Sequence, residues 1–299
     1  MNIVIDARMS DEQRRAALYA GSVFVYSPRK ASLELCEFAR QLIREAFPGL
    51  DPETAQRDMP VERYASILEQ LKPKFIHHPE SKRLIRDLLR EVGCDETTTY
   101  FDVPRMRTST SDGYLTTGIA YAFHPHRDTW YSAPLCQVNW WMPIYDVEAN
   151  NVMAFHPQYW DRSISNTSAV YDYQRWTQTS RFNAAQHIGK DTRVQPHAEV
   201  QVAMVPDMRV VMPVAGFMMF SAAQLHSSVP NTSGRTRFSI DFRTANVEDA
   251  IAARGAANRD SRCTGTALTD FLRVSDLEHI PQNVLDMYMP GHPQAVVEA

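Results

Sequence analysis

The pattern of apolar and polar positions divides the chain into a helical first third and a strand-rich middle. Apolar residues recur at amphipathic-helix spacing in SLELCEFARQLIREAF (32–47), VERYASILEQLK (61–72) and SKRLIRDLLREVG (81–93). One short apolar run before them, GSVFVYS (21–27), predicts a strand. We therefore expect residues 1–98 to be mainly helical.

From about residue 100 the pattern changes to short segments rich in β-branched and aromatic residues, separated by Asp-Gly, Asn-Asn and proline turn signals. Strands are predicted within 97–110, 113–125, 135–147, 150–157, 199–206, 209–214, 216–228 and 236–245. Helical patterns are confined to 168–178 and to the tail at 266–276. Central strands with helices at both ends indicate an α+β fold with a mainly antiparallel barrel or sandwich core.

We expect residues 1–299 to form a single domain, since no linker, repeat or low-complexity tract divides them. Within it, residues 99–245 would be the β core with an insert at 155–190, and residues 246–299 a C-terminal extension.

Composition and charge narrow the class of protein. A hydrophobic content of 44% is ordinary for a soluble globular chain, and a net charge of −4 without a dense basic cluster argues against nucleic-acid binding. No apolar run is long enough to cross a bilayer, and the polar N-terminus is unlike a signal peptide. The four cysteines form no CxxC pair, which is typical of reduced thiols. We expect a cytoplasmic protein with no membrane partner.

The stretch FHPHRDTWY (123–131) holds three potential metal ligands at alternate positions, His124, His126 and Asp128. If 115–124 is a strand that continues through them, neighbours at i and i+2 lie about 6.6 Å apart and can share an ion. Positions i and i+4 lie about 13 Å apart, which is too far. At most two of the three would bind one metal, so a third ligand must come from elsewhere.

The best third ligand is His226, at the end of the apolar segment 216–228. His126, Asp128 and His226 would form the two-histidine, one-carboxylate triad that holds Fe(II) on one face and leaves three positions open. Arg237 follows His226 by eleven residues, on a strand expected to run back alongside it, and its guanidinium could grip a dicarboxylate. Ser239 would face the same side as Arg237.

These residues resemble the iron(II)- and 2-oxoglutarate-dependent dioxygenases. LHSSVPNTSGRTRFSI (225–240) and the segment 137–160 are similar to the phytanoyl-CoA dioxygenase-like branch, although Phe155-His156-Pro157-Gln158 stands where that branch has Pro-Gly-Ser-His. The resemblance covers about residues 100–245, roughly half of the chain.

The resemblance implies a double-stranded β-helix (jelly-roll, cupin-like) core with Fe(II) at its open end, held by His126, Asp128 and His226. The cosubstrate 2-oxoglutarate would chelate the iron and pair its far carboxylate with Arg237, with Ser228 and Ser239 as hydrogen-bond partners. The expected reaction uses O2 to oxidise, most simply hydroxylate, a C–H bond of a small molecule, with release of succinate and CO2. Retention of Asp128 favours hydroxylation over halogenation.

Several alternatives stay open. His124 could replace Asp128 in a His-x-His pair suited to zinc, as in a cupin-type isomerase or hydrolase that does not use 2-oxoglutarate. Arg235 and Arg243 rival Arg237 for the cosubstrate. A third alternative is that the protein is a non-catalytic jelly-roll binding module with a degenerate metal site. The kinase loop that also begins His-Arg-Asp is excluded, because Ala133 stands where it needs Asn.

The substrate and its surroundings are less defined by the sequence. Gln137 and Asn139 alternate with Trp141 along one predicted strand and are candidate cosubstrate contacts, although the opposite set Val138, Trp140 and Met142 could equally face the site. Aromatic and arginine residues of the 155–190 insert suggest a polar or anionic small molecule, such as a secondary-metabolite intermediate. A homodimer is possible.

Overall fold

The strands of the chain form two sheets, as the computed structural model shows for residues 1–179 and 181–289. The large sheet has the order β1 (Ile3–Ile5), β2 (Val23–Tyr26), β8 (Phe217–Ser221), β5 (Val138–Pro143), β10 (Arg237–Asn246), β3 (Thr99–Phe101) and β11 (Leu272–Arg273), with β4 (Arg105–Ser109) also paired to β10. The small sheet has the order β7 (Met208–Arg209), β6 (Met153–Phe155) and β9 (His226–Ser228). An isolated antiparallel bridge joins His126 to His226 at the outer edge of β9.

The chain passes between the two sheets in a jelly-roll order. From β4 it goes to the bridge at His126, returns to the large sheet in β5, forms β6 and β7 in the small sheet, and returns in β8. It then makes β9 in the small sheet and β10 in the large one. This is the order of a double-stranded β-helix, so the predicted fold class is confirmed.

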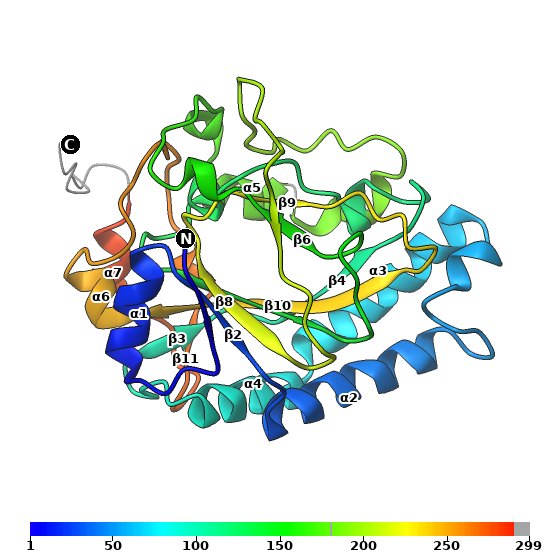
Figure 1. Cartoon of the computed structure of the whole chain (residues 1–299), viewed down its shortest axis with the longest axis horizontal. Coiled ribbons are helices and arrows are strands. Elements are labelled where there is room, and N and C mark those ends of the chain that lie inside the picture. The colour runs from blue at the N-terminus through cyan, green and yellow to red at the C-terminus, as the bar shows by residue number, and fades with distance from the viewer. Residues whose placement is uncertain (180, 290–299) are drawn as a thin grey trace.

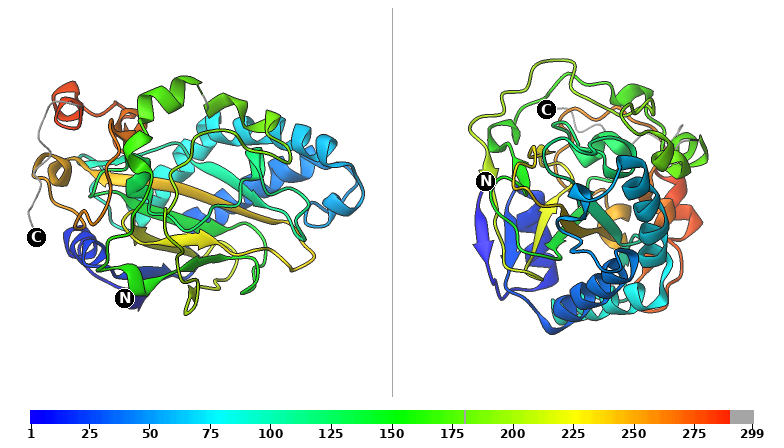
Figure 2. Two further views of the ribbon diagram at one scale, coloured as in Figure 1. Left: turned by 90° about the horizontal axis from the view of Figure 1, so that it is seen from above. Right: turned by 90° about the vertical axis from the view of Figure 1, so that its right-hand side faces the viewer.

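Three helices cover the outer face of the large sheet, α2 (Lys30–Ala46), α3 (Val61–His77) and α4 (Pro79–Glu91) (Figures 1 and 2). Their apolar stripes, which include Leu35, Leu68 and Leu88, pack in one core with Trp140 and Ile240 of the sheet. The helices predicted at 32–47, 61–72 and 81–93 are therefore confirmed, and α3 continues through Pro73 to His77.

The inner face of the large sheet, defined here as the face toward the small sheet, has a second apolar cluster. Trp141, Met218 and Phe220 of the large sheet pack there with Phe155 of the small sheet. Because side chains alternate along a strand, Gln137, Asn139 and Trp141 lie on this inner side, whereas Val138, Trp140 and Met142 belong to the helix-side core.

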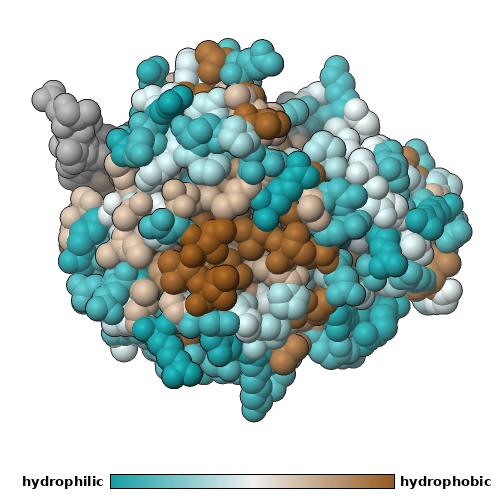
Figure 3. All heavy atoms as spheres, in the orientation of Figure 1, coloured by the Kyte–Doolittle hydropathy of each residue, from teal (hydrophilic) through white to brown (hydrophobic). Residues whose placement is uncertain are grey.

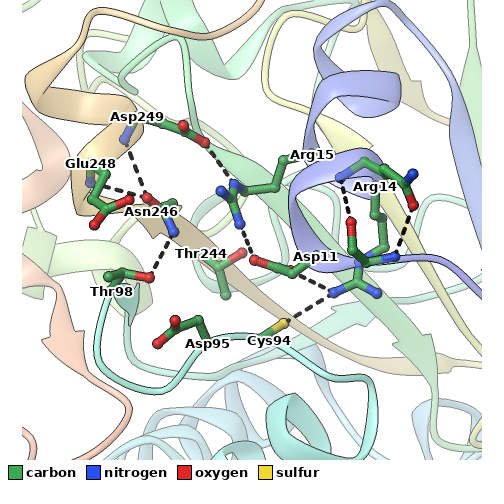
Figure 4. A network of polar contacts seen from close by, with 12 residues as sticks. Asp11, Arg14, Arg15, Cys94, Asp95, Thr98, Thr244, Asn246, Glu248 and Asp249 are labelled. Atoms are coloured by element: carbon green, nitrogen blue, oxygen red, sulfur yellow. Dashed lines mark hydrogen bonds and ion pairs between the residues drawn. The ribbon is translucent and has the colours of Figure 1, made fainter.

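The N-terminal segment contains a helix that the sequence pattern did not reveal, α1 (Asp11–Tyr19), which begins with a capping box between Ser10 and Gln13. A polar network attaches it to the C-terminal part of the chain (Figure 4). Arg15 pairs with Asp11 and, at 2.6 Å, with Asp249 of α6 (Val247–Ile251). The hydroxyl of Tyr19 also donates to Asp249, at 2.8 Å. The short helix α7 (Gln282–Asp286) follows α6 along the chain.

Five sequence predictions of elements were wrong or only partly right. Residues 115–124 form a 3-10 turn, Gly118–Ala120, in place of a strand. Gly118 has a φ of +61°, and a Cβ on it would lie 2.3 Å from the carbonyl oxygen of Ala184, so neither an extended conformation nor a side chain fits there.

Residues 199–206, all of which the structure describes, contain no strand. Most of their apolar residues are exposed, with Val205 at 81%, and only Val202 packs on a buried apolar cluster, so the segment has no apolar face to pair in a sheet. In 209–214 only Arg209 joins β7. The predicted helix at 168–178 is a 3-10 turn (Ser168–Val170) followed by α5 (Tyr173–Thr179), and the one at 266–276 is a 3-10 turn (Ala267–Asp270) followed by β11.

The edge strand of the large sheet, β1, exposes apolar side chains at the surface. The exposed fractions of Ile3 and Ile5 on the edge strand β1 are 45% and 70%, and Figure 3 shows apolar side chains gathered on the same face, near the middle of the view. In the described part of the chain no helix is both long and apolar enough to cross a membrane. The expected homodimer and the cytoplasmic location stay predictions.

Candidate metal centre

Three side chains that are distant in sequence converge beside the edge of the small sheet. His126, Asp128 and His226 each offer one ligand atom, and these atoms all lie within 4.8 Å of one another. Backbone hydrogen bonds fix the two histidines opposite each other, with the N–H of each donating to the carbonyl of the other at 2.9 and 3.0 Å. The structure thus brings together the three residues that the sequence predicted as ligands.

Hydrogen bonds of the imidazole rings orient both histidines for metal binding. Nδ1 of His126 lies 2.8 Å from the carbonyl oxygen of His124, and Nδ1 of His226 lies 3.0 Å from that of Gln224. A carbonyl oxygen only accepts, so Nδ1 carries the proton in both rings. The Nε2 atoms are the ring nitrogens directed at Asp128 Oδ1, at 3.3 Å from His126 and 3.9 Å from His226. Such second partners are typical of metal-ligating histidines.

The protonation states of the cluster suit a divalent cation. Burial, together with the nearby His126, lowers the pKa of His226 to about 4, so the ring is neutral at pH 7. Burial alone would raise the pKa of Asp128, but the side chains of His126, His226 and Arg243 outweigh it and hold that pKa well below its usual range. Neutral imidazoles and an ionised carboxylate are the forms that bind a metal ion.

Asp128 presents one oxygen to the histidines and the other to an arginine. Oδ1 faces the two Nε2 atoms, whereas Oδ2 lies 3.9 Å from Nε of Arg243 on β10. The residue begins a 3-10 turn, Asp128–Tyr131, so the straight strand that the sequence argument assumed is absent here. His124 is exposed and does not belong to the cluster, in agreement with the expectation that it is a neighbour rather than a ligand.

Arg237 is a half-buried cation that has no carboxylate within ion-pair distance among the described residues; Asp241, which acts on it electrostatically, pairs instead with Arg107. Its Nε atom is inaccessible to solvent and has no hydrogen-bond acceptor. The guanidinium lies 5.6 Å from the ring centre of Trp141, which places it on the inner face of the large sheet. Burial lowers the pKa of Arg237 to about 10. A half-buried guanidinium without an ion pair is well suited to bind the carboxylate of a ligand.

The other predicted cosubstrate contacts lie around the same face. Ser239 Oγ is fully buried and, like Nε of Arg237, has no partner within the described part of the chain. Ser228 Oγ accepts from the backbone N–H of Phe123 at 3.0 Å, which leaves its proton to donate. Gln137 donates to Asn139 at 2.9 Å, and Asn139 lies opposite Arg243 in the register of β5 and β10.

Arg235 and Arg243, the two alternative arginines for cosubstrate binding, each lie close to a carboxylate of the chain. Arg235 lies in the turn before β10, its side chain 57% exposed and 3.9 Å from Glu53. Arg243 lies 3.2 Å from Asp102 and 3.6 Å from Asp241, besides its approach to Asp128. Neither offers the free positive charge that Arg237 does.

The sequence analysis missed a group of charged residues on the inner face. Arg107 of β4 pairs with Asp241 of β10 at 2.7 Å, and Arg105 pairs with Asp102. Lys72 of α3 donates to the carbonyl of Ile119, and burial, together with nearby Arg107, lowers its pKa to about 7. The alternation Arg237-x-Ser239-x-Asp241-x-Arg243 could have revealed Asp241, because the four share one face of the strand.

One expected contact between strands was wrong. Arg237 was expected on a strand running back alongside that of His226, but β9 pairs with β6 and β10 pairs with β3, β4 and β5. His226 and Arg237 therefore belong to facing sheets. A ligand that contacts both residues would have to bridge the two sheets.

Solved structures similar to this chain include 2-oxoglutarate-dependent non-haem enzymes. EvdO2 from Micromonospora carbonacea var. aurantiaca is 11% identical, with 97% of this chain and 99% of that chain covered and a TM-score of 0.44; another structure holds EvdO2 complexed with 2-oxoglutarate. The epimerase SnoN from nogalamycin biosynthesis, in complex with Fe3+, alpha ketoglutarate and nogalamycin RO, is 12% identical, with 79% and 85% covered and a TM-score of 0.39.

No protein-family model and no curated protein matches the sequence. The structural neighbours are too distant to carry an argument about reaction or substrate, which has to come from the site itself. Membership of the phytanoyl-CoA dioxygenase-like branch stays a prediction.

Proposed function

We propose that this chain is a non-haem Fe(II)- and 2-oxoglutarate-dependent oxygenase that oxidises a C–H bond of a small molecule. The observation that carries the proposal is the unpaired guanidinium of Arg237 on the sheet that faces a His-Asp-His cluster. A metal triad alone serves many reactions, but a metal triad facing a sheet that carries a half-buried guanidinium with no ion pair within the described residues suits an anionic cosubstrate.

His126 Nε2, Asp128 Oδ1 and His226 Nε2 would hold the iron. Two imidazoles and one carboxylate are the donor set of Fe(II) oxygenases and leave three positions for the cosubstrate and O2. The bound iron and 2-oxoglutarate supply the oxidising chemistry, with succinate and CO2 as products. Because Asp128 is retained as a ligand, hydroxylation is the outcome we propose.

The remaining residues bind and orient. Arg237 would pair with the far carboxylate of 2-oxoglutarate, and the buried Ser239 hydroxyl would donate to it. Ser228, Gln137 and Asn139 are the further hydrogen-bond donors that we propose for the cosubstrate. Arg243 holds the second oxygen of Asp128, which leaves the first directed at the metal.

Aromatic side chains around His126 limit the access of water. Phe123 stacks on its ring with centroids 5.0 Å apart, and the ring of Tyr131 meets it edge-on at 5.4 Å. A dry site strengthens the electrostatic interactions that hold a charged cosubstrate.

The experiment is an anaerobic titration of the purified chain with Fe(II) and then 2-oxoglutarate, followed by the visible absorption of the iron–keto-acid chelate. Addition of O2 should then release succinate, slowly even without the true substrate. Asp128→Ala should lose the chelate absorption and the succinate, whereas His124→Ala, a change at an exposed neighbour outside the cluster, should keep both. Iron binding without any binding of 2-oxoglutarate would favour the cupin-type isomerase or hydrolase instead.

A further inference from the structure

Arg127, the residue between the two ligands His126 and Asp128, is buried and fully engaged in hydrogen bonds. Its side chain is 1% exposed. Nη2 donates to the carbonyls of Tyr159 and Arg162 at 2.6 and 2.8 Å, Nη1 donates to the carbonyl of Ala223, and Nε lies 3.2 Å from Oδ2 of Asp260. A guanidinium fixed at every nitrogen cannot move without moving the backbone that carries both ligands.

The same guanidinium reaches the segment that carries the third ligand. Ala223 lies in the turn between β8 and β9, three residues before His226. The next residue in that turn, Gln224, offers the carbonyl that orients the His226 ring. The turn also accepts a backbone hydrogen bond from Thr129, through the carbonyl of Ala222. The side chain of Arg127 therefore links the two ligand-bearing segments in addition to their backbone hydrogen bonds.

Asp260 anchors this arrangement from the C-terminal extension. Its side chain is 4% exposed and accepts from three donors: Arg127 Nε, Nε1 of Trp130 at 2.6 Å and the backbone N–H of Ile164 at 2.9 Å. Arg127 and Trp130 lie on either side of Asp128 in the sequence, and Trp130 is in its 3-10 turn. Asp260 does not belong to the metal-ligand cluster itself.

We infer that the Arg127–Asp260 pair positions the metal ligands, with Asp260 acting through Arg127 and Trp130 to hold the two ligand-bearing segments in register. The inference rests on the proposed metal centre. Removal of the Asp260 charge would leave a buried guanidinium without its counter-ion, and the resulting shift of Arg127 would change the geometry at Asp128 and His226. Changes to residues that support metal ligands typically cost about 10- to 100-fold in metal affinity.

The test is titration of the apo protein with Co(II), which reports both affinity and, through its visible absorption, coordination geometry. Asp260→Asn should weaken Co(II) binding about tenfold or more and alter the visible spectrum of the bound ion. The matched control is Asp161→Asn, a surface residue 79% exposed that pairs with Arg259 in a neighbouring loop. It should leave the affinity and the spectrum unchanged. The melting temperature of each apo protein separates loss of fold from loss of ligand geometry.

A second variant keeps the inference testable if Asp260→Asn does not fold. Arg127→Lys retains the charge opposite Asp260 but cannot reach Ala223 and Tyr159 together, so it should also weaken Co(II) binding and alter the spectrum. A folded variant at either position with the wild-type affinity and spectrum would overturn the inference, since the pair would then serve stability alone. Failure of the wild type to bind Co(II) would instead remove the proposed function, and the inference with it.

Discussion

At the scale of single residues, the arginines of the inner face differ in whether a carboxylate neutralises them. Arg105, Arg107 and Arg243 each lie within 4 Å of an aspartate, whereas Arg237 has none among the residues that the structure describes. A paired arginine adds little net charge to its surroundings. The absence of an ion pair at Arg237 among these residues is the reason we propose it as the residue that binds the anionic cosubstrate.

Arg237→Ala should therefore weaken 2-oxoglutarate binding by about 100-fold, since hydrogen bonds to charged groups are worth roughly 1.5–3 kcal/mol and a dicarboxylate would make at least one. The apparent Kd from the chelate absorption at fixed Fe(II) is the measurement. Iron affinity should change little, because the residue is not a ligand.

Arg235→Ala is the control at the exposed position two residues earlier, and it should leave the 2-oxoglutarate Kd unchanged. Equal affinities for the Arg237→Ala variant and the wild type would transfer the role to Arg243.

The residues of the triad and Arg237 were predictable because metal ligation and anion binding restrict the residue types and their spacing. Arg127 was not. Its partner Asp260 lies 133 residues away, and no periodic pattern connects them. A buried ion pair between loops leaves no signal in a single sequence, because its geometry comes from the tertiary fold.

At the scale of elements, β10 organises the large sheet. It pairs with β3, β4 and β5. Its residues point alternately to the two sides of the sheet. On one side Phe238, Ile240 and Phe242 pack against the helices, and on the other Arg237, Ser239 and Asp241 face the small sheet. The sequence predicted this strand because the alternation is clear. It could not predict which strand lies next to β10, since alternation defines the faces of a strand but not its neighbours.

The false strand at 199–206 and the missed helix α1 have related causes. Val200, Met204 and Val205 are exposed, and only Val202 of that segment packs on a buried apolar cluster, so the apolar pattern there does not reflect a sheet face. Helix α1 is mostly polar: its apolar contact with the core comes from its last turn, with Leu18 fully buried, and its capping box and Arg15 hold the rest. Periodicity detects only elements that are stabilised by apolar burial.

Helix α3 contributes a lysine whose burial makes stability depend on pH. The folded chain loses the Lys72 proton near pH 7, whereas the unfolded chain keeps it up to about pH 10.4. Between these values the unfolded state binds more protons, so the free energy of unfolding of the apo protein should rise with pH, by about 1–2 kcal/mol from pH 7 to 9. Urea unfolding at the two pH values measures it.

Lys72→Met should remove this part of the pH dependence, and Lys74→Met, at an exposed position of the same helix, should keep it. If both variants depend on pH as the wild type does, Lys72 is not the group responsible.

At the scale of the whole molecule, the metal centre connects segments that are otherwise far apart. Asp128 and His226 are separated by almost a hundred residues, and Arg127 and Asp260 link the same region to the C-terminal extension. A metal that binds only the folded arrangement stabilises the fold as a whole.

Fe(II) or Co(II) at about 100 times its Kd should stabilise the protein by about 2.7 kcal/mol and raise Tm by roughly 3 °C. Thermal unfolding with and without the metal measures the shift, and a chelator should reverse it. Asp128→Ala should melt at the same temperature in both conditions. A metal-induced rise of the same size in this variant would place the binding elsewhere on the chain.

The central place of β10 also has a consequence for biosynthesis. The strands β4 and β5 emerge from the ribosome about a hundred residues before the strand that lies between them, and until then each lacks its partner on that side. The nascent chain therefore carries two unsatisfied strand edges through roughly a third of its translation, and a product that stops short of residue 237 would keep them. Chaperones that cover exposed strands should bind such truncated products and release the full-length chain.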